Sequence, residues 1–540
     1  MIVLAVLGIM ICCGSGYLKK EFGFSAPSGF YDEPFYLEIT AERGSEIYYT
    51  LNGSVPDKDS PATMKYEGPI LLENVSVNDN TWASASDMSE YFYDELPAYK
   101  VDKANIVRAV AYNRKGEAGE VISGTYFIGL PKEKYENIAV ISLIADPDDL
   151  WGYEKGIYVK GISQELYPEG TDSGLVAPTE YSANYNMRGK EWERECDTEW
   201  FFPETDEVMQ QTVGIRVKGN YSRSFAQKSF NLFAREEYGK NKFNYDFWND
   251  NDKLVEESSI TLFAGGYSDK ATKLKDALIG ELVGDLEVTV SKARPCVVFL
   301  DGEYWGFYQI MPRVKADYLE DHYDIPSGNL TFVETGKNVI VEGHEELYEE
   351  LLTYVKINDM SSEEAYDGIC EMIDMQSFMD YFAVNIYIHN KDWPDNNMLM
   401  WRSNQKGQRT YEDTKWRWIV HDVNTSKCMD HERVDADTTE NARDDEVFTA
   451  LLENAEFRQA FYDNFVRISE EVFEPGHVCE ILFRKAEEIK PYMEEDYERF
   501  PNQYTIGEDF VENVQNVADF FRERSAYIIP YVQRMMEEYE

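Results

Sequence analysis

The first part of the chain has short stretches in which hydrophobic residues alternate with polar ones. Four of these stretches are rich in β-branched and aromatic residues: 35–39, 46–51, 106–112 and 121–127. The dipeptide Asn52-Gly53 follows the second stretch and favours a tight turn. Short strands separated by turns predict an all-β sandwich over residues 24–129, with the acid-rich stretch 74–100 inserted as a loop.

The pattern changes after a linker at about residue 130. A continuous apolar run over 138–144 is typical of a buried strand, and two apolar runs around Asp301-Gly302 predict a β-hairpin. We also expect helices over 274–283, 315–322 and 376–389, and strands over 156–159, 398–402 and 416–420. Together these predict an α+β domain over 138–530, in which an acid-rich loop at 427–446 precedes a helical region over 447–540.

An apolar run of about a dozen residues, from Ile2 to Cys13, stands at the start of the chain. It is too short to span a bilayer and predicts a signal peptide or lipoprotein-type leader over residues 1–22. The alternative is a buried strand. No later apolar run is long enough for a transmembrane span, so we expect a secreted or cell-envelope protein, held at most by a lipid anchor.

Acidic residues outnumber basic ones by 101 to 52, which gives a net charge of −49. Such a chain repels nucleic acid and anionic membranes, so neither is an expected partner. Any phosphate-binding site must therefore be a local basic exception. The cysteines beyond the leader are scattered and predict neither a disulfide framework nor a zinc site.

One such basic exception lies in the window 208–235, which contains no Asp or Glu. Its basic residues are Arg216, Lys218, Arg223, Lys228 and Arg235. Strands at 214–219 and 228–233 flank a polar turn with two serines, an arrangement that can cover the phosphates of a nucleotide. The alternative is an ordinary hairpin with solvated basic side chains.

The acidic counterpart is the turn-prone stretch around Trp393-Pro394. Asp392 and Asn397 are five residues apart, the spacing of the catalytic Asp and the metal-binding Asn in a protein-kinase catalytic loop. Asp422 follows the strand 416–420, where a second metal-binding carboxylate is expected. The pattern predicts a phosphoryl-transfer site, whereas the alternative is a set of solvated turn residues.

Several segments follow one another in a recognisable order: Gly189-Lys190-Glu191-Trp192, Gly219-Asn220-Tyr221-Ser222-Arg223, Gln227-Lys228-Ser229-Phe230, Lys275-Asp276-Ala277, Gly302-Glu303-Tyr304-Trp305-Gly306 and Asp392-Trp393-Pro394-Asp395-Asn396-Asn397. Over roughly 138–530 the chain resembles the spore-coat CotH kinase family. The resemblance implies an atypical protein-kinase-like fold that uses ATP and Mg²⁺ or Mn²⁺ to phosphorylate a coat or surface protein. The spore coat is then an alternative location.

The resemblance also implies roles for individual residues. Asp392 would orient or deprotonate the acceptor hydroxyl, and Lys228 would hold the nucleotide phosphates. Ser222, Arg223 and Lys218 would help to bind the nucleotide, and the metal would be held by Asn397, Asp422 and Asn424. Separately, the stretches 48–56 and 66–70 resemble the small β-sandwich at the C-terminus of chitobiase and hexosaminidase enzymes, which implies an accessory domain associated with cell-wall carbohydrate.

Two departures from the family pattern leave a second function open. The family has Asp-x-Asp where this chain has Asp422-Val423-Asn424, and it has Glu-Arg where this chain has Pro312-Arg313. Either change could weaken catalysis, so the alternative is an inactive kinase-fold surface protein that binds coat, cell-wall or host components. Glycoside hydrolysis is a third hypothesis, but no particular pair of carboxylates supports it.

Overall fold

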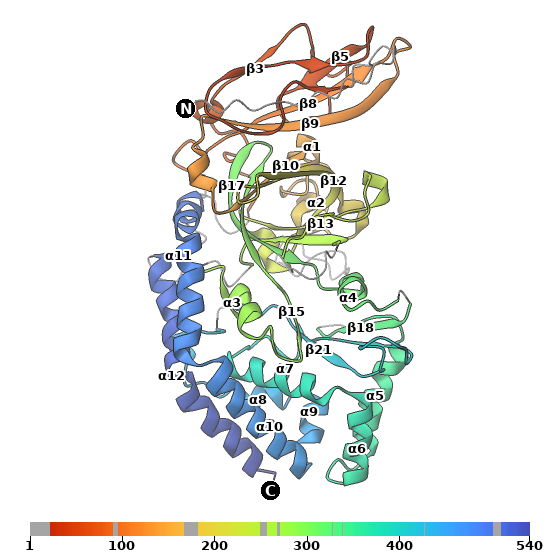
Figure 1. Cartoon of the computed structure of the whole chain (residues 1–540), viewed down its shortest axis with the longest axis vertical. Helices are drawn as coiled ribbons and strands as arrows, with labels where there is room; N and C mark the ends of the chain where they lie inside the picture. The colour runs from red at the N-terminus through yellow and green to blue at the C-terminus, as the bar shows by residue number, and fades with distance from the viewer. Residues whose placement is uncertain are drawn as a thin grey trace, which may run out of the picture.

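The computed structural model describes residues 22–89, 96–166, 182–248, 256–266, 271–326, 328–336, 339–425, 427–500 and 509–539. The expected leader over 1–22 lies almost entirely outside the described residues. Figure 1 shows a β-sandwich at the top, a β-barrel in the middle, and a second sheet with most of the helices below. The expected multidomain arrangement of an all-β part and an α+β part is confirmed.

The N-terminal part is built from a five-stranded sheet and two short β-pairs. The sheet has the order β2 (Gly29–Tyr31), β9 (Ala118–Ile128), β8 (Asn105–Tyr112), β5 (Glu46–Thr50) and β6 (Met64–Lys65). The pairs are β3 (Phe35–Leu37) with β7 (Ile70–Leu72), and β1 (Gly23–Phe24) with β4 (Ile39–Thr40). Leu37, Leu72, Val107 and Tyr126 pack between the layers, which confirms the predicted sandwich.

The barrel closes in the order β10 (Ala139–Ala145), β11 (Arg194–Phe202), β12 (Glu207–Lys218), β13 (Ser229–Phe233), β14 (Ser259–Phe263), β17 (Glu303–Pro312) and β16 (Arg294–Leu300). The predicted hairpin is β16–β17, in which Leu300 pairs with Glu303 across Asp301-Gly302. Both turn residues have positive φ, as a type I′ turn requires.

The second sheet has the order β15 (Thr289–Val290), β21 (Arg417–Val420), β20 (Leu399–Ser403), β18 (Leu330–Glu334) and β19 (Ile340–Glu342). The helices are α1 (Pro147–Trp151), α2 (Ser163–Leu166), α3 (Lys275–Leu282), α4 (Ala316–Tyr323), α5 (Glu345–Ile357), α6 (Glu363–Met372), α7 (Met375–Tyr387), α8 (Thr439–Ala442), α9 (Glu446–Leu451), α10 (Ala455–Arg467), α11 (Pro475–Arg499) and α12 (Phe510–Glu537). Among the described residues, no helix is both long and apolar enough to cross a membrane.

Two local expectations were wrong. Residues 156–159 form turns instead of a strand. The backbone N–H groups of Ile157 and Tyr158 donate to the carbonyls of Asp149 and Leu150 at 2.9 Å each, and not to a neighbouring strand. The acid-rich stretch 427–446 is not an open loop throughout, since it contains a short 3-10 helix, η7 (His431–Arg433), and α8.

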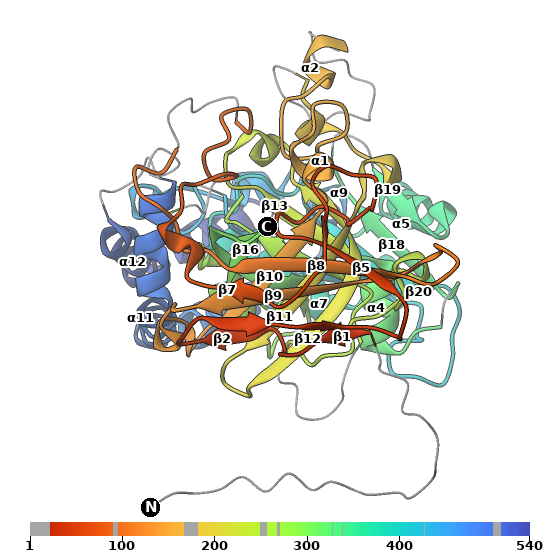
Figure 2. The same cartoon turned by 90° about the horizontal axis from the view of Figure 1, so that it is seen from above.

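Buried polar contacts join the sandwich to the barrel below it. Strands β8 and β9 lie across the top of the barrel (Figure 2). Arg108 of β8 forms an ion pair with Asp197 of β11 at 2.9 Å, and Thr125 of β9 donates to Ser142 of β10 at 2.8 Å. The two parts therefore share a specific polar interface.

Glu199 of β11 lies in the same interface and makes it sensitive to pH. Ser28 of the sandwich donates to its Oε1 at 2.7 Å. Burial raises the pKa of this carboxyl from 4.5 to about 7, although hydrogen bonds from Thr125, Ser28 and Gln210 lower it in part. Because the pKa is higher in the folded chain, the native state holds more protons, and stability falls as the pH rises from about 4.5 to about 7.

We expect Glu199→Gln to raise the free energy of unfolding at pH 8 by about 1–3 kcal/mol, because it removes a buried negative charge. At pH 5 the gain should be much smaller, since the native carboxyl is already protonated. Urea unfolding at both pH values measures the difference. Glu195→Gln, at an exposed position of the same strand, is the matched control, and an equal gain at both pH values would contradict the interpretation.

Candidate functional site

The candidate site lies where the second sheet meets the barrel. Strands β20 and β21 are antiparallel neighbours, so the residues before β20 and those after β21 emerge at the same edge of the sheet. The loop between α7 and β20 carries Asp392 and Asn397, and the segment after β21 carries Asp422 and Asn424. The fold thus brings together four of the predicted site residues.

Each of the two amides donates a hydrogen bond to a neighbouring carboxylate. Asn397 Nδ2 lies 3.1 Å from Asp392 Oδ2, and Asn424 Nδ2 lies 3.0 Å from Asp422 Oδ1. The first bond fixes the orientation of the Asp392 carboxylate across a five-residue loop. The second links the two residues that flank Val423.

A third carboxylate, Asp276, enters the site from a distant part of the chain. It stands at the start of α3, where its Oδ1 accepts from the backbone N–H of Val423 at 3.2 Å and its Oδ2 accepts from Asn424 Nδ2. Asp276 belongs to one of the segments that carry the resemblance to the CotH kinase family, but the resemblance implied no role for it. We refer to Asp276, Asp392, Asn397, Asp422 and Asn424 as the acid cluster.

The carboxylates of the acid cluster influence one another. Desolvation is the main cause that raises the pKa of Asp392, and the negative charge of Asp422 raises it further. Hydrogen bonds from Asn397 and Asn396 lower it in part. A raised pKa makes Asp392 a better proton acceptor near neutral pH than an ordinary aspartate.

Two residues of the acid cluster hold an uncommon backbone conformation. Asn397 has φ 61° and Asp422 has φ 53°, both in the left-handed region that side chains other than glycine seldom adopt. Such conformations are concentrated at functional sites, where the surrounding structure enforces them. Two of the three positions that were predicted to hold a metal therefore have this conformation.

The acid cluster has the donor chemistry of a magnesium site. Mg²⁺ prefers oxygen ligands and is usually bound through one or two carboxylates together with substrate phosphates and water. A cation would also relieve the repulsion between Asp392 and Asp422 that raises the Asp392 pKa. Within the described residues no three His, Cys, Asp or Glu side chains form a metal site by themselves, so amide oxygens and substrate would have to complete it.

Lys218 provides positive charge close to the acid cluster. It ends β12, and its ammonium lies 4.7 Å from the ring centre of Phe263, at the end of β14. A side chain at Gly266 would come within 3.9 Å of Asn424 Oδ1, so this segment borders the acid cluster. In the part of the chain that the structure describes, no carboxylate forms an ion pair with Lys218.

His421 connects this lysine with the acid cluster. Desolvation lowers the pKa of the imidazole, Asp422 raises it and Lys218 lowers it, so both charges act on the same ring. Sequence reasoning gave no role to Lys315 and Glu334, which form an ion pair nearby and also influence this pKa. The surroundings of the acid cluster therefore contain basic side chains on a protein that is otherwise strongly acidic.

The contacts of Lys228 argue against the phosphate-binding role that the resemblance implies for it. Its side chain is fully buried, and its ammonium donates to the carbonyls of Met88, Arg223 and Phe225 at 2.7, 2.6 and 2.7 Å. Three protein acceptors match the three protons of an ammonium group. The contacts favour a structural role for Lys228 over phosphate binding.

Arg223 is also used within the protein. Burial lowers the pKa of its guanidinium to about 9, and the group donates to the carbonyls of Gly219, Tyr185 and Met187. Ser222 lies in the same 3-10 turn, η5 (Tyr221–Ser224), and its hydroxyl occupies the space that a side chain at Gly219 would need. These residues shape the turn between β12 and β13, which we call the phosphate turn because of its predicted function.

The two departures from the family pattern have different surroundings. Asn424 replaces a carboxylate but lies beside Asp276, so the cluster still has a carboxylate at this point. Pro312 ends β17, and Arg313 beyond it lies over the ring of Phe233 at 5.5 Å. Arg313 also lies 4.0 Å from a carboxylate oxygen of Asp317, one turn further along the chain.

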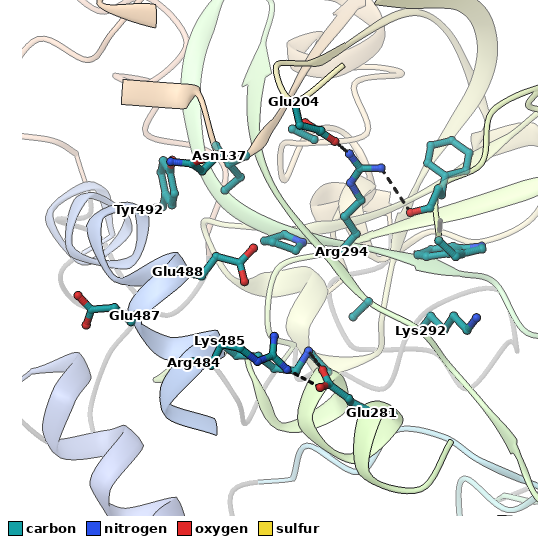
Figure 3. Close-up of a pocket in the computed structure, with 18 of the residues that line it drawn as sticks. Asn137, Glu204, Glu281, Lys292, Arg294, Arg484, Lys485, Glu487, Glu488 and Tyr492 are labelled. Carbon is teal, nitrogen blue, oxygen red and sulfur yellow. Dashed lines mark hydrogen bonds and ion pairs between the residues drawn. The ribbon is translucent and has the colours of Figure 1, made fainter. Parts of the chain in front are cut away.

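A cavity of about 1260 Å³ lies elsewhere, between the barrel, α3 and α11 (Figure 3). Arg484 and Lys485 of α11 pair with Glu281 of α3 on its wall, and Arg294 pairs with Glu204. None of the predicted site residues lines this cavity. It is therefore separate from the acid cluster.

Two family models match the chain. The model described as CotH kinase protein matches residues 215–528, which is more than half of the chain and includes the whole acid cluster. The model described as Fn3 associated matches residues 37–126, within the N-terminal sandwich. No curated protein matches the chain significantly.

Proposed function

Since this chain belongs to the CotH kinase protein family, we propose that it is a protein kinase that transfers the γ-phosphoryl group of ATP to a hydroxyl group of a coat or surface protein. The observation that carries the proposal is the acid cluster. Asp392 and Asp422 come from two loops, and the charge of Asp422 raises the pKa of Asp392. Kinase chemistry relies mainly on positioning and on neutralising phosphate charge, and it needs an oxygen-rich site of this kind.

Asp392 is the proposed catalytic residue. The acceptor hydroxyl would donate its proton to the Asp392 carboxylate while its oxygen forms a bond to the γ-phosphorus. The bond from this phosphorus to the bridging oxygen breaks, and ADP leaves with the electron pair. Asn397 supports the step by holding Asp392 Oδ2 at 3.1 Å, and the raised pKa of Asp392 favours proton transfer.

Asp422, Asn397 and the pair Asp276–Asn424 are the proposed ligands of the metal. When bound, Mg²⁺ would neutralise charge on the phosphates and fix their orientation. Lys218 is the proposed phosphate-binding cation, because it lies beside the acid cluster and has an ammonium that no described carboxylate pairs with. Ser222 would contribute through the phosphate turn.

Incubation with γ-labelled ATP and Mg²⁺ or Mn²⁺ tests the proposal. We expect label on this protein itself or on an added serine-containing acceptor protein, and no label when a chelator removes the metal. Asp395→Asn changes an exposed carboxylate of the same loop and should leave the transfer intact. Absence of label with both metals would contradict a kinase function.

The second candidate is a surface protein that keeps the fold without turnover. Asn424 favours it, because a neutral amide next to Asp276 and Asp422 compensates less metal charge than a second acid would. In this case the sandwich would act in adhesion, with cell-wall carbohydrate as a candidate ligand, and the protein would reside at the cell envelope or spore coat. Calorimetry that detects no binding at millimolar ATP with Mg²⁺ would support this function.

We expect Asn424→Asp to increase the affinity for Mg²⁺ by about three- to tenfold if the acid cluster binds the metal, because a carboxylate is a stronger ligand for a hard cation than an amide. The Mg²⁺ concentration that gives half-maximal nucleotide binding measures the effect. Gln405→Glu adds the same charge at an exposed position of the loop between β20 and β21, away from the acid cluster, and serves as the control. An equal gain from both variants would indicate a general charge effect instead of a ligand.

A further inference from the structure

A loop of the N-terminal part of the chain, which contains Met88 and Ser89, contacts the phosphate turn through two hydrogen bonds. Ser89 Oγ donates to the carbonyl of Ser224 at 3.0 Å, and the carbonyl of Met88 accepts from Lys228 Nζ at 2.7 Å. Met88 and Ser89 are both buried, although they lie more than 130 residues before the turn. The contact therefore belongs to the protein interior and not to its surface.

Lys228 joins this loop to the turn. Its ammonium binds the carbonyls of Arg223 and Phe225 in addition to that of Met88, so the carbonyls of three consecutive residues, 223 to 225, each accept a bond from either Lys228 or Ser89. Tyr185 also lies against the ammonium, with its ring centre at 4.0 Å. The backbone of the turn is thus fixed on the side that faces the N-terminal part.

Separation of the loop from the turn would leave buried groups without partners. A buried ammonium that loses one of three acceptors incurs a desolvation penalty larger than that of a neutral donor. The loop is itself tied to the barrel domain, because the carbonyl of Asp87 accepts from Lys160 N at 2.9 Å. The loop and the turn should therefore move as one unit.

We infer that Met88, Ser89 and Lys228 are positioning residues that hold the phosphate turn in the conformation that binds nucleotide. The inference rests on the proposed function of the turn. It gives the N-terminal part of the chain a direct influence on nucleotide affinity, through two hydrogen bonds and without any contact to Asp392. It also gives a structural reason for the presence of Lys228 in the acid-free window 208–235.

Three variants of the full-length protein test the inference: Ser89→Ala, Lys228→Met and the control Lys103→Met. Lys103 is a second buried lysine, and its ammonium also has three acceptors, namely Asn78 O, Asn80 Oδ1 and Val101 O. None of these acceptors belongs to the phosphate turn. Lys103→Met should lower the thermal stability as Lys228→Met does, but only Lys228→Met should affect the turn.

Amide hydrogen exchange of residues 219–226 provides the first readout and needs no nucleotide. We expect exchange in this segment to accelerate by about three- to tenfold in Ser89→Ala and by more in Lys228→Met, and to remain at the wild-type rate in Lys103→Met. The second readout is the KM for ATP, which should rise by similar factors while kcat changes less. If Lys228→Met does not fold, Ser89→Ala alone decides.

The two readouts separate the inference from the proposed function. If exchange accelerates but the wild-type protein binds no ATP, the contact positions the turn and the proposed function fails. If the wild-type protein binds ATP and Ser89→Ala changes neither exchange nor KM, the inference is overturned and the proposed function stands. An equal effect of Lys103→Met on the turn would also overturn the inference.

Discussion

Asp392→Asn should reduce phosphoryl transfer by about 10²–10⁴-fold, the usual contribution of a general base or an equivalent positioning group. Asparagine keeps the shape of the side chain and a hydrogen-bond acceptor for Asn397, but it cannot take up the proton of the acceptor hydroxyl. ATP affinity should remain within about threefold of the wild-type value, because the proposed phosphate and metal ligands are other residues.

Steady-state transfer from labelled ATP, together with calorimetric ATP binding, measures the two quantities separately. Asp395→Asn is the matched control, because this carboxylate is exposed in the same loop, three residues further along the chain. Transfer by Asp392→Asn at the wild-type rate would remove the assigned role, even if the protein proved to be a kinase.

Asp496→Ala should lower the free energy of unfolding by about 3–5 kcal/mol, the range for breaking a buried ion pair from one side. Asp496 of α11 and Lys273 are both fully buried and lie 2.6 Å apart. The carboxylate also accepts from Gln227 Nε2 at 2.9 Å and from the backbone N–H of Phe307 at 2.7 Å. The substitution leaves an ammonium and two further donors without this acceptor.

Chemical unfolding at pH 7 measures the loss. Glu494→Ala, at an exposed position of the same helix, should change the stability by less than about 0.5 kcal/mol. A double variant, Lys273→Met with Asp496→Leu, should recover part of the stability, since it removes both charges from the interior. A loss below about 1 kcal/mol in Asp496→Ala would show that α11 is not anchored to the barrel through this pair.

Local patterns predicted the elements that carry the site. The apolar runs at 138–144, 398–402 and 416–420 form β10, β20 and β21, and the Asp301-Gly302 turn forms the hairpin β16–β17. In each case the side-chain period and the turn chemistry depend on residues that are close in sequence. The pairing of Asp392 with Asn397 has the same local origin.

The remaining site features depend on contacts between distant residues. Asp276 meets Asn424 across 148 residues, and no local pattern distinguishes it from other helix-starting acids. Lys228 and Lys218 both stand in the acid-free window, yet the ammonium of Lys228 is buried against the carbonyl of Met88, 140 residues away in the sequence. A one-residue difference in strand position sends a side chain to the opposite face, so charge composition alone could not separate the two lysines.

A calorimetric titration of the protein with ATP in the presence of Mg²⁺ tests the central claim most directly, because it examines the acid cluster without requiring an acceptor substrate. We expect one nucleotide per chain with a Kd between about 1 μM and 1 mM, the range of typical KM values. Binding should depend on Mg²⁺ and should weaken at least tenfold in Asp422→Ala. Binding that is absent at millimolar ATP, or that is unaffected by removal of Mg²⁺ and of the Asp422 carboxylate, would contradict the claim that the acid cluster is a metal–nucleotide site.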